Sequence, residues 1–156
     1  MVNLTIEIQD KAIQGYLKQV QRKLGDLTPL MKIISETMHT AVQRNFQTEG
    51  ARLPGGKWQE LADSTKKERS KIGKWPGSIL QVNRNLLGGI SPEHDSTTAA
   101  VGSSMPFKTG YAAIHQFGGK AGRGKGFTMP ARPFFELADE NMEDIKDDKS
   151  VLQKIL

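Results

Sequence analysis

Two periods of hydrophobic residues mark the start of the chain. Between residues 2 and 8, apolar and polar side chains alternate, and a period of two predicts a half-buried strand. Residues 13–24 instead place apolar side chains at the spacing of one helix face, and Gly25 follows as a stop signal. The chain is therefore expected to open with a strand followed by a helix.

A second, longer helix is predicted from Thr28 to Phe46. Thr28 is a residue type that caps helices, and Pro29 fits the first turn, where no backbone donor is needed. The apolar residues that follow form one continuous face, consisting of Leu30, Ile33, Ile34, Met38, Ala41, Val42 and Phe46. We expect this face to form the centre of the core.

The periodicity breaks between residues 50 and 78. The run Leu53-Pro54-Gly55-Gly56 is typical of a turn, and a short polar helix is predicted to begin at Asp63 or Ser64 and to reach Lys71. This segment has many charges and few apolar residues, so little burial offsets the cost of ordering its backbone. We therefore expect a protruding arm at 50–78 that is mobile in the isolated chain.

The second half of the chain predicts smaller elements. Two short antiparallel strands are expected between residues 80 and 102, joined by a turn at 93–96. A helical turn is expected at 109–117 and a further strand around 127–129. A last helix is predicted to begin at Pro133, with its apolar residues inward and its acidic residues outward.

These elements define an expected fold class. A chain of 156 residues is long enough for one domain with its own core. We expect an α+β fold over residues 1–156, in which an N-terminal strand and two long helices pack on a small antiparallel sheet. A C-terminal helix follows, with a frayed tail at 148–156.

Two motifs in the last third of the chain are its most specific features. In YAAIHQFGG, residues 111–119, large side chains at helical spacing precede two glycines, which favour backbone geometry that ends a helix. In MPARPFF, residues 129–135, two prolines bracket an arginine. Neither motif has the chemistry of an active site, so both are interpreted as structural. The motif residues are Tyr111, His115, Gly118, Gly119, Pro130, Arg132 and Pro133.

The polar residues of the chain give no sign of catalysis. His115 is expected to form an orienting hydrogen bond, for example by donating to a backbone carbonyl of the following glycine loop. The three histidines lack the spacing of metal ligands, and the chain has no cysteine. The sequence contains no recognisable Ser-His-Asp or paired-carboxylate pattern. We therefore expect no catalytic residue, no metal site and no cofactor.

The order of these features resembles the Mu-like phage virion morphogenesis family, also called tail completion proteins. The resemblance covers residues 30–135 and rests on Y-A-x-x-H-x-x-G-G and M-P-A-R-P-F, with a basic Gly-rich loop between them. It implies a non-enzymatic structural protein of a phage or prophage that acts in tail completion or head–tail joining, as a subunit of a ring. The implied partners are other tail or head–tail connector proteins and further copies of the chain. The implied location is the virion, and the host cytoplasm during assembly.

The net charge of +5 is unevenly distributed. Residues 136–156 contain seven acidic residues and three lysines, a net charge of −4, so the other 135 residues carry +9. A basic body with an acidic end suggests head-to-tail association between copies or contact with nucleic acid. The alternative is a solvated acidic helix without a partner. The candidate interface acids are Glu140, Glu143, Asp144 and Asp147.

Basic residues support an alternative function, nucleic-acid binding through the arm 57–75 and the Gly-rich loop 118–126. The loop nearly matches the nucleotide-binding pattern G-x-x-x-x-G-K-[ST], but Gly126 replaces the metal-binding hydroxyl, so nucleotide hydrolysis is not expected. What remains is salt-sensitive contact with a phosphate backbone or an acidic neighbour. The residues concerned are Lys66, Lys67, Arg69, Lys120, Arg123 and Lys125.

Trp58 and Trp75 flank the basic arm. Aromatic side chains interleaved with cations can stack on nucleic-acid bases, but they are equally good anchors for a protein partner. Because the chain has only two tryptophans, we favour the anchor role and count both as candidate interface residues. No membrane partner is expected, since no stretch approaches the length of a membrane-spanning helix.

Overall fold

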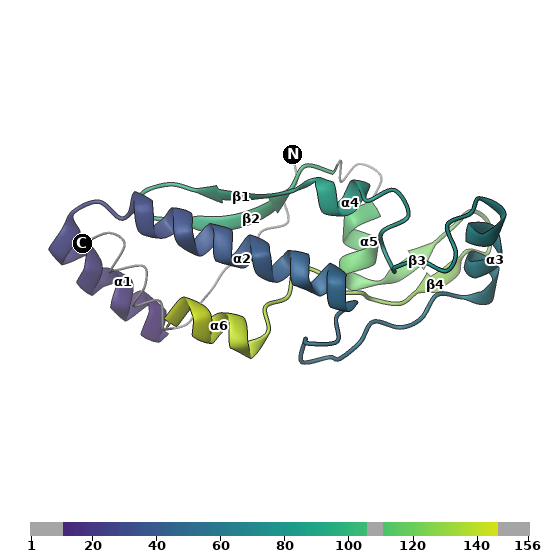
Figure 1. The fold of residues 1–156 in the computed structure, drawn as a ribbon, viewed down its shortest axis with the longest axis horizontal. Coiled ribbons are helices and arrows are strands. Elements are labelled where there is room, and N and C mark those ends of the chain that lie inside the picture. The colour runs from purple at the N-terminus through teal and green to yellow at the C-terminus, as the bar shows by residue number, and fades with distance from the viewer. Residues whose placement is uncertain (1–10, 106–110, 147–156) are drawn as a thin grey trace.

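The computed structural model describes residues 11–105 and 111–146 as an elongated α+β fold, with α1 and α3 at opposite ends (Figure 1). The helices are α1 (Lys11–Leu24), α2 (Thr28–Thr48), α3 (Asp63–Lys71), α4 (Asn85–Gly88), α5 (Tyr111–Phe117) and α6 (Asp139–Lys146). The strands are β1 (Ile90–His94), β2 (Ala99–Ser103), β3 (Gly119–Ala121) and β4 (Phe127–Met129). The strand expected at 2–8 and the tail expected at 148–156 lie outside the described residues.

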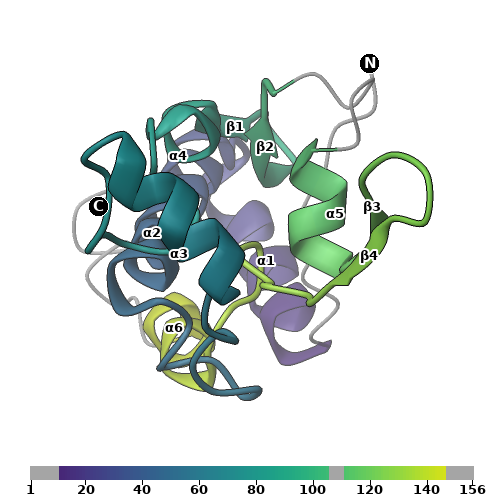
Figure 2. The same ribbon diagram turned by 90° about the vertical axis from the view of Figure 1, so that its right-hand side faces the viewer.

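Helix α2 is the central element, as its apolar stripe predicts. It lies between the β1–β2 hairpin on one side and α6 on the other, an arrangement visible in both ribbon views (Figures 1 and 2). Its apolar face is buried together with two polar side chains that interrupt the stripe, Ser35 and Asn45. At its C-terminal end, the Phe46 ring packs edge-on against Trp58, with 5.7 Å between the ring centroids. The tilted ring of Phe134 also packs on Phe46, with 5.4 Å between the centroids.

The start of α2 differs in detail from the prediction. Thr28 does not cap the helix; instead, its backbone N–H and its hydroxyl both donate to the Asp26 carboxylate, at 2.9 and 2.8 Å. These hydrogen bonds hold the pKa of Asp26 below its usual value. The residue at the N-cap position is Leu27, and no side chain caps the helix there.

The expected antiparallel pair is confirmed as the β1–β2 hairpin, with Ile90 opposite Ser103 and His94 opposite Ala99. Its turn lies two residues later than predicted. The Asp95 carboxylate closes this turn by accepting hydrogen bonds from the N–H groups of Thr97 and Thr98 at 2.7 and 2.8 Å, an Asx-type turn. Both strands contact α2, and β2 is the more buried of the two, since most residues of β1 are exposed.

The last helix begins at Asp139, six residues after the predicted start at Pro133. Side chains from distant elements bind the backbone groups that a helix would have used. Asn45 donates to the carbonyls of Phe134 and Glu136 at 3.0 and 2.7 Å, and this stretch is not helical. The expected inward residues are nevertheless buried or half-buried, and Phe134 is fully buried.

A second hairpin connects α5 to the rest of the chain. The strand expected around 127–129 is confirmed as β4, which pairs with β3 so that Gly119 lies opposite Met129. Strand β3 was not predicted, because Gly-Lys-Ala has no apolar alternation. Almost all side chains of this hairpin are exposed, and α5 makes the main contact that holds it.

Candidate functional site

The two sequence motifs meet in the structure. The backbone N–H of Arg132 donates to the carbonyl of His115 at 2.7 Å. The side-chain oxygen of Gln116 accepts hydrogen bonds from the backbone N–H groups of Phe134 and Phe135, at 3.0 Å each. These hydrogen bonds connect α5 to the non-helical stretch that precedes α6.

Gly118 lies where the two motif segments come closest. Its φ angle is 70°, and a Cβ atom added there would lie 2.8 Å from the nitrogen of Ala131 and 2.9 Å from the carbonyl oxygen of Met129. Both neighbours are backbone atoms, so neither can move as a side chain would. The position therefore requires glycine for its conformation and for the space it leaves.

Arg132 ties the motif region to the segment before α3. Its side chain is only 4% exposed, and its guanidinium donates to the backbone carbonyls of Gln59 at 3.1 Å and Glu60 at 3.3 Å. Burial lowers the pKa of Arg132, and the nearby charge of Arg69 lowers it further. This arginine thus works inside the molecule as a brace between two segments.

His115 lines a cleft of about 590 Å³ between the α3 segment and β4, which we call the histidine cleft. The imidazole is 8% exposed, its ring lies edge-on against Tyr111 at 4.6 Å, and its Nδ1 has no hydrogen-bond partner among the described residues. The expected bond from the ring to the glycine loop is therefore not formed at Nδ1. Burial, together with the charge of Arg132, lowers the pKa of His115 to about 4.

The histidine cleft is lined by both polar and apolar groups. At neutral pH its imidazole is uncharged and one buried nitrogen remains free for a hydrogen bond. The walls combine apolar side chains such as Leu61 and Phe127 with the cations Lys66 and Arg69. Among the described residues, no group of three or more potential metal ligands comes together.

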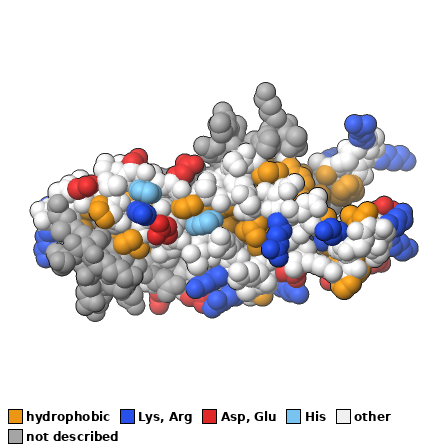
Figure 3. Space-filling view, turned by 45° about the horizontal axis from the view of Figure 1, so that its top comes forward, with side chains coloured by type: hydrophobic (Ala, Val, Ile, Leu, Met, Phe, Trp, Pro, Cys, Tyr) orange, Lys and Arg blue, Asp and Glu red, His pale blue; other side chains and the backbone are white. Residues whose placement is uncertain are grey.

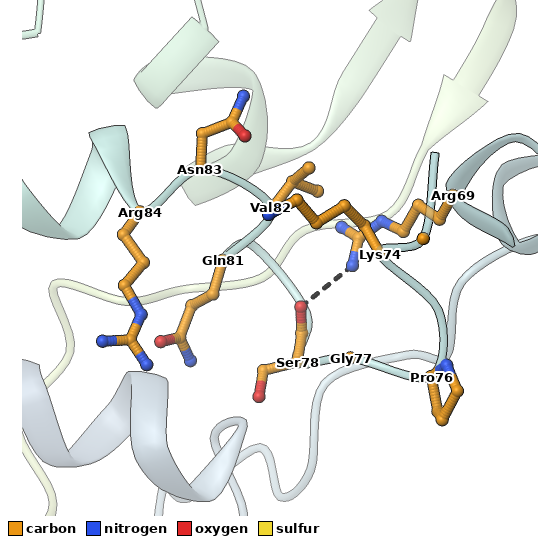
Figure 4. A pocket seen from close by; sticks show the side chains of 10 residues that line it. Arg69, Lys74, Pro76, Gly77, Ser78, Gln81, Val82, Asn83 and Arg84 are labelled. Carbon is orange, nitrogen blue, oxygen red and sulfur yellow. Dashed lines mark hydrogen bonds between the residues drawn. The ribbon is translucent and has the colours of Figure 1, made fainter. Parts of the chain in front are cut away.

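A second cleft, of about 510 Å³, lies in the segment between α3 and α4 (Figure 4). We call it the cation cleft, because Arg69, Lys74 and Arg84 line it and no acidic residue does. The guanidinium of Arg69 is held in place by donating to the carbonyl of Ser78 at 2.9 Å, which the dashed line in Figure 4 marks.

Both clefts belong to a strongly cationic part of the molecule, which we call the basic end and define as residues 57–84 and 118–130. It contains ten Lys or Arg residues and three Asp or Glu residues, a net charge of +7. Figure 3 shows Lys and Arg side chains gathered at the end where α3 and the β3–β4 hairpin lie. Lys120, Arg123 and Lys125 are exposed at the tip of this hairpin.

The glycine loop is not a nucleotide-binding loop. Residues 119–129 form the β3–β4 hairpin, whereas that motif needs a strand on one side and a helix on the other.

Several predicted contact residues turn out to support the fold. Trp58 is 4% exposed and its indole nitrogen donates to the carbonyl of Pro133 at 3.2 Å, so it is a core residue and not a surface anchor. Trp75 is half-buried, with the Lys66 ammonium 5.4 Å from its ring centre. Arg69 is 9% exposed, and only Lys67 of the three predicted arm cations is fully exposed. The protruding arm at 50–78 stays a prediction.

The acidic residues of α6 are only partly available. Glu140 forms an ion pair with Arg52 at 2.6 Å, so one of the four predicted interface acids already has a partner in its own chain. Glu143 is exposed. The side chain of Asp144 and the whole of Asp147 lie outside the described residues.

Sequence reasoning missed Arg84 as a member of a site and included Lys74 only as part of the arm 57–75, without naming it as a contact residue. Neither belongs to a recognisable motif, and Arg84 adopts a left-handed backbone conformation (φ 55°) that nothing in the run Asn83-Arg84-Asn85 required. Their proximity to Arg69 depends on how the segment after α3 folds back.

The comparison with known proteins agrees with the motif pair. The profile of the phage virion morphogenesis family matches residues 8–153. The chain belongs to this family. It is 36% identical over 146 residues to the "Mu-like prophage FluMu G protein 2" of Haemophilus influenzae, covering 93% of this chain and 92% of that protein. It is also 29% identical over 149 residues to the "Putative capsid assembly protein G" of Escherichia phage Mu, covering 94% and 91% of the two chains.

Family membership establishes the broad role. The protein is a phage structural or assembly protein, and it works with other virion proteins. The family is one of morphogenesis proteins and not a known enzyme family. No significant match to a solved structure was found. No helix in the described part of the chain is long and apolar enough to cross a membrane.

Proposed function

We propose that the protein is a ring-forming subunit that completes the tail or joins it to the head. The observation that carries this proposal is the β3–β4 hairpin and its surroundings. Phe117, just before the hairpin, is 69% exposed, and Phe127, within it, is 58% exposed. A two-stranded hairpin is at best marginally stable alone, and exposed aromatic side chains are typical of binding surfaces. A neighbouring subunit would supply the contacts that this region lacks.

The shape and the clefts support the same proposal. A closed ring needs two different faces on each subunit, so that one copy contacts the next through unlike surfaces. The elongated molecule offers such a pair, because its basic end has a net charge of +7, whereas α6 carries the exposed acids Asp139, Glu140 and Glu143 (Figure 1). The histidine cleft, with its unpaired imidazole nitrogen, adds a place where a neighbour's polar group would bind.

The test is a mass measurement by light scattering on the purified protein, alone and with neighbouring virion proteins of the same phage. We expect a defined oligomer that Phe117→Ser and Phe127→Ser together convert to monomers. The matched control is Ile72→Ser, because Ile72 is 63% exposed and lies outside the hairpin. If the control dissociates the oligomer equally, or if the paired substitution leaves it intact, the hairpin is not the subunit interface.

Phage assembly in the absence of the protein distinguishes this role from capsid assembly, the role that the name of the phage Mu relative gives. We expect complete heads and complete tails that fail to join, seen by electron microscopy. The absence of assembled heads would instead favour a role in building the capsid and would overturn the proposal.

A further inference from the structure

Three positively charged side chains line the cation cleft, and no acidic side chain of the lining offsets their charge. It is lined by two arginines and a lysine, Arg69, Lys74 and Arg84, with the side-chain amides of Gln81 and Asn83 beside them (Figure 4). Each of these side chains offers hydrogen-bond donors, and no carboxylate lines the cleft. Such a set is suited to an anion with several acceptor oxygens, of which a phosphate group is the commonest example.

The acidic residues near the basic end are already engaged elsewhere. Three ion pairs, Glu49–Lys57, Glu60–Lys66 and Glu68–Lys71, use the available carboxylates apart from Asp63. In the described part of the chain, no carboxylate forms an ion pair with any of the remaining cations of the basic end. These cations are Lys67, Arg69, Lys74, Arg84, Lys120, Arg123 and Lys125.

The backbone at the cleft is held in an unfavourable conformation. Arg84 has a φ angle of 55°, in the left-handed region that residues with a Cβ rarely adopt. Backbone strain of this kind persists where the surroundings fix it, and it is found preferentially at ligand-binding sites. Here it places a guanidinium at the rim of a cleft that already holds two other cations (Figure 4).

The distribution of the unpaired cations favours a polymer over a single small anion. Beyond the cleft, Lys67 on α3 and three cations on the hairpin tip continue the positive surface of the same end (Figure 3). The cleft has no exposed aromatic ring for stacking on bases, since Trp75, the nearby aromatic residue, is half-buried and covered by Lys66. A contact through phosphates alone would therefore be independent of base sequence.

We propose that the basic end binds the phosphate backbone of duplex DNA, with the cations that line the cation cleft, Arg69, Lys74 and Arg84, contacting its phosphates. The choice of DNA among polyphosphates rests on the proposed function, because a subunit at the head–tail junction lies on the path of the genome. The cleft itself recognises only the phosphate. The contact releases counterions, so its strength falls steeply as salt rises.

Binding is measured by fluorescence anisotropy on the purified full chain, with a random-sequence DNA duplex at a series of KCl concentrations. Lys74→Ala and Arg84→Asn are the test variants. Asparagine tolerates the left-handed conformation, so Arg84→Asn removes the charge while keeping the backbone. Each substitution is expected to weaken binding about 10-fold at 0.1 M salt and to reduce the slope of log K against log salt by about 0.9.

The matched controls are Lys18→Ala and Arg22→Asn, which make the same charge changes on exposed positions of α1, at the opposite end of the molecule (Figure 1). We expect these controls to retain affinity to within about twofold. Equal losses for both pairs, or unchanged binding by the cleft variants, would overturn the assignment of the cleft. Thermal melts of all four variants confirm that the comparison is made between folded proteins.

Two further arms identify the ligand. Inorganic phosphate at 10 mM should weaken DNA binding only slightly beyond the effect of chloride at the same ionic strength, because it replaces only the contacts in the cleft, and polyglutamate should bind much more weakly than the duplex. Complete displacement of the DNA by 10 mM phosphate would reassign the cleft to a small anion, and tight polyglutamate binding would reassign it to an acidic protein partner; either result overturns the DNA proposal. DNA binding is measured independently of assembly, so the two proposals can fail separately. A ring that forms but binds no DNA would contradict only this inference, whereas DNA binding without ring formation would contradict only the proposed function.

Discussion

The region around α2 and the basic end differ in how their polar groups are used. Around α2, buried polar side chains are satisfied, as when the Asn45 amide donates to two backbone carbonyls of the stretch before α6. At the basic end, Arg84 and Lys74 have no ion-pair partner among the described residues, and beside it the Nδ1 of His115 has no hydrogen-bond partner among them. The first arrangement stabilises the fold, whereas the second leaves groups free to bind something else.

The comparison is sharpest for aromatic residues. Phe46 is fully buried and contacts Trp58 and Phe134, whereas Phe127 is 58% exposed. We expect Phe46→Ala to lower the free energy of unfolding by about 3–5 kcal/mol, because it leaves a cavity in a packed cluster. Phe127→Ala should change it by no more than about 0.5 kcal/mol. Urea unfolding measures both, and equal losses would show that the hairpin is part of the core.

Substitution of two glycines tests how closely the motif segments pack where the two regions join. Gly118→Ala should destabilise the protein by about 1–3 kcal/mol, since the new Cβ would meet the backbone of Met129 and Ala131 and the φ angle of 70° is unfavourable for alanine. Gly124 has a similar φ of 67° but nothing within 4 Å of the added Cβ. Gly124→Ala should therefore cost only about 1 kcal/mol. A smaller loss at Gly118 in thermal melts would contradict the close packing of the motifs.

The unpaired imidazole should make stability depend on pH. The pKa of His115 is lowered from 6.5 to about 4 in the folded chain, so the unfolded chain binds the proton more readily. This contribution is fully present above pH 6.5 and is lost as the pH falls from 6.5 towards 4, at a slope of up to about 1.4 kcal/mol per pH unit. His115→Leu should flatten the slope in that window, measured by urea unfolding at each pH. His94→Leu, at an exposed position, is the control and should leave it unchanged.

The smallest effect is expected on α6. Glu140 and Arg52 form a surface ion pair with about half of each side chain exposed, so Glu140→Gln should cost about 0–1 kcal/mol. Glu143→Gln should stay within about 0.5 kcal/mol. If these acids contact the basic end of another copy, both changes should weaken association, and salt near 1 M, which screens charges beyond about 3 Å, should do the same. If association is unchanged by both the substitutions and the salt, the acidic residues of α6 form a solvated face and not an interface.

Local patterns were sufficient for the regular elements of the fold. The stripe from Leu30 to Phe46 predicted α2 and its burial, because helical periodicity and core packing select the same residues. The limits of α3 and the end of α5 followed from turn and glycine signals of the same local kind, whereas the predicted start of α5 at 109 lies outside the described residues. The motif pair was also enough to indicate the family to which the chain belongs.

Tertiary contacts decided the remaining features. The stretch after Pro133 is not helical before Asp139, because Asn45 and Gln116, which are distant in sequence, bind its backbone groups. Trp58 looked like a surface anchor within a charged segment, but Phe46 and Pro133 close around it. The cation cleft exists because the chain folds back after α3 and brings Arg84 to Arg69. Sequence periodicity reports only the neighbours along a helix or strand, so contacts between distant segments are fixed by packing and hydrogen bonding in the folded chain.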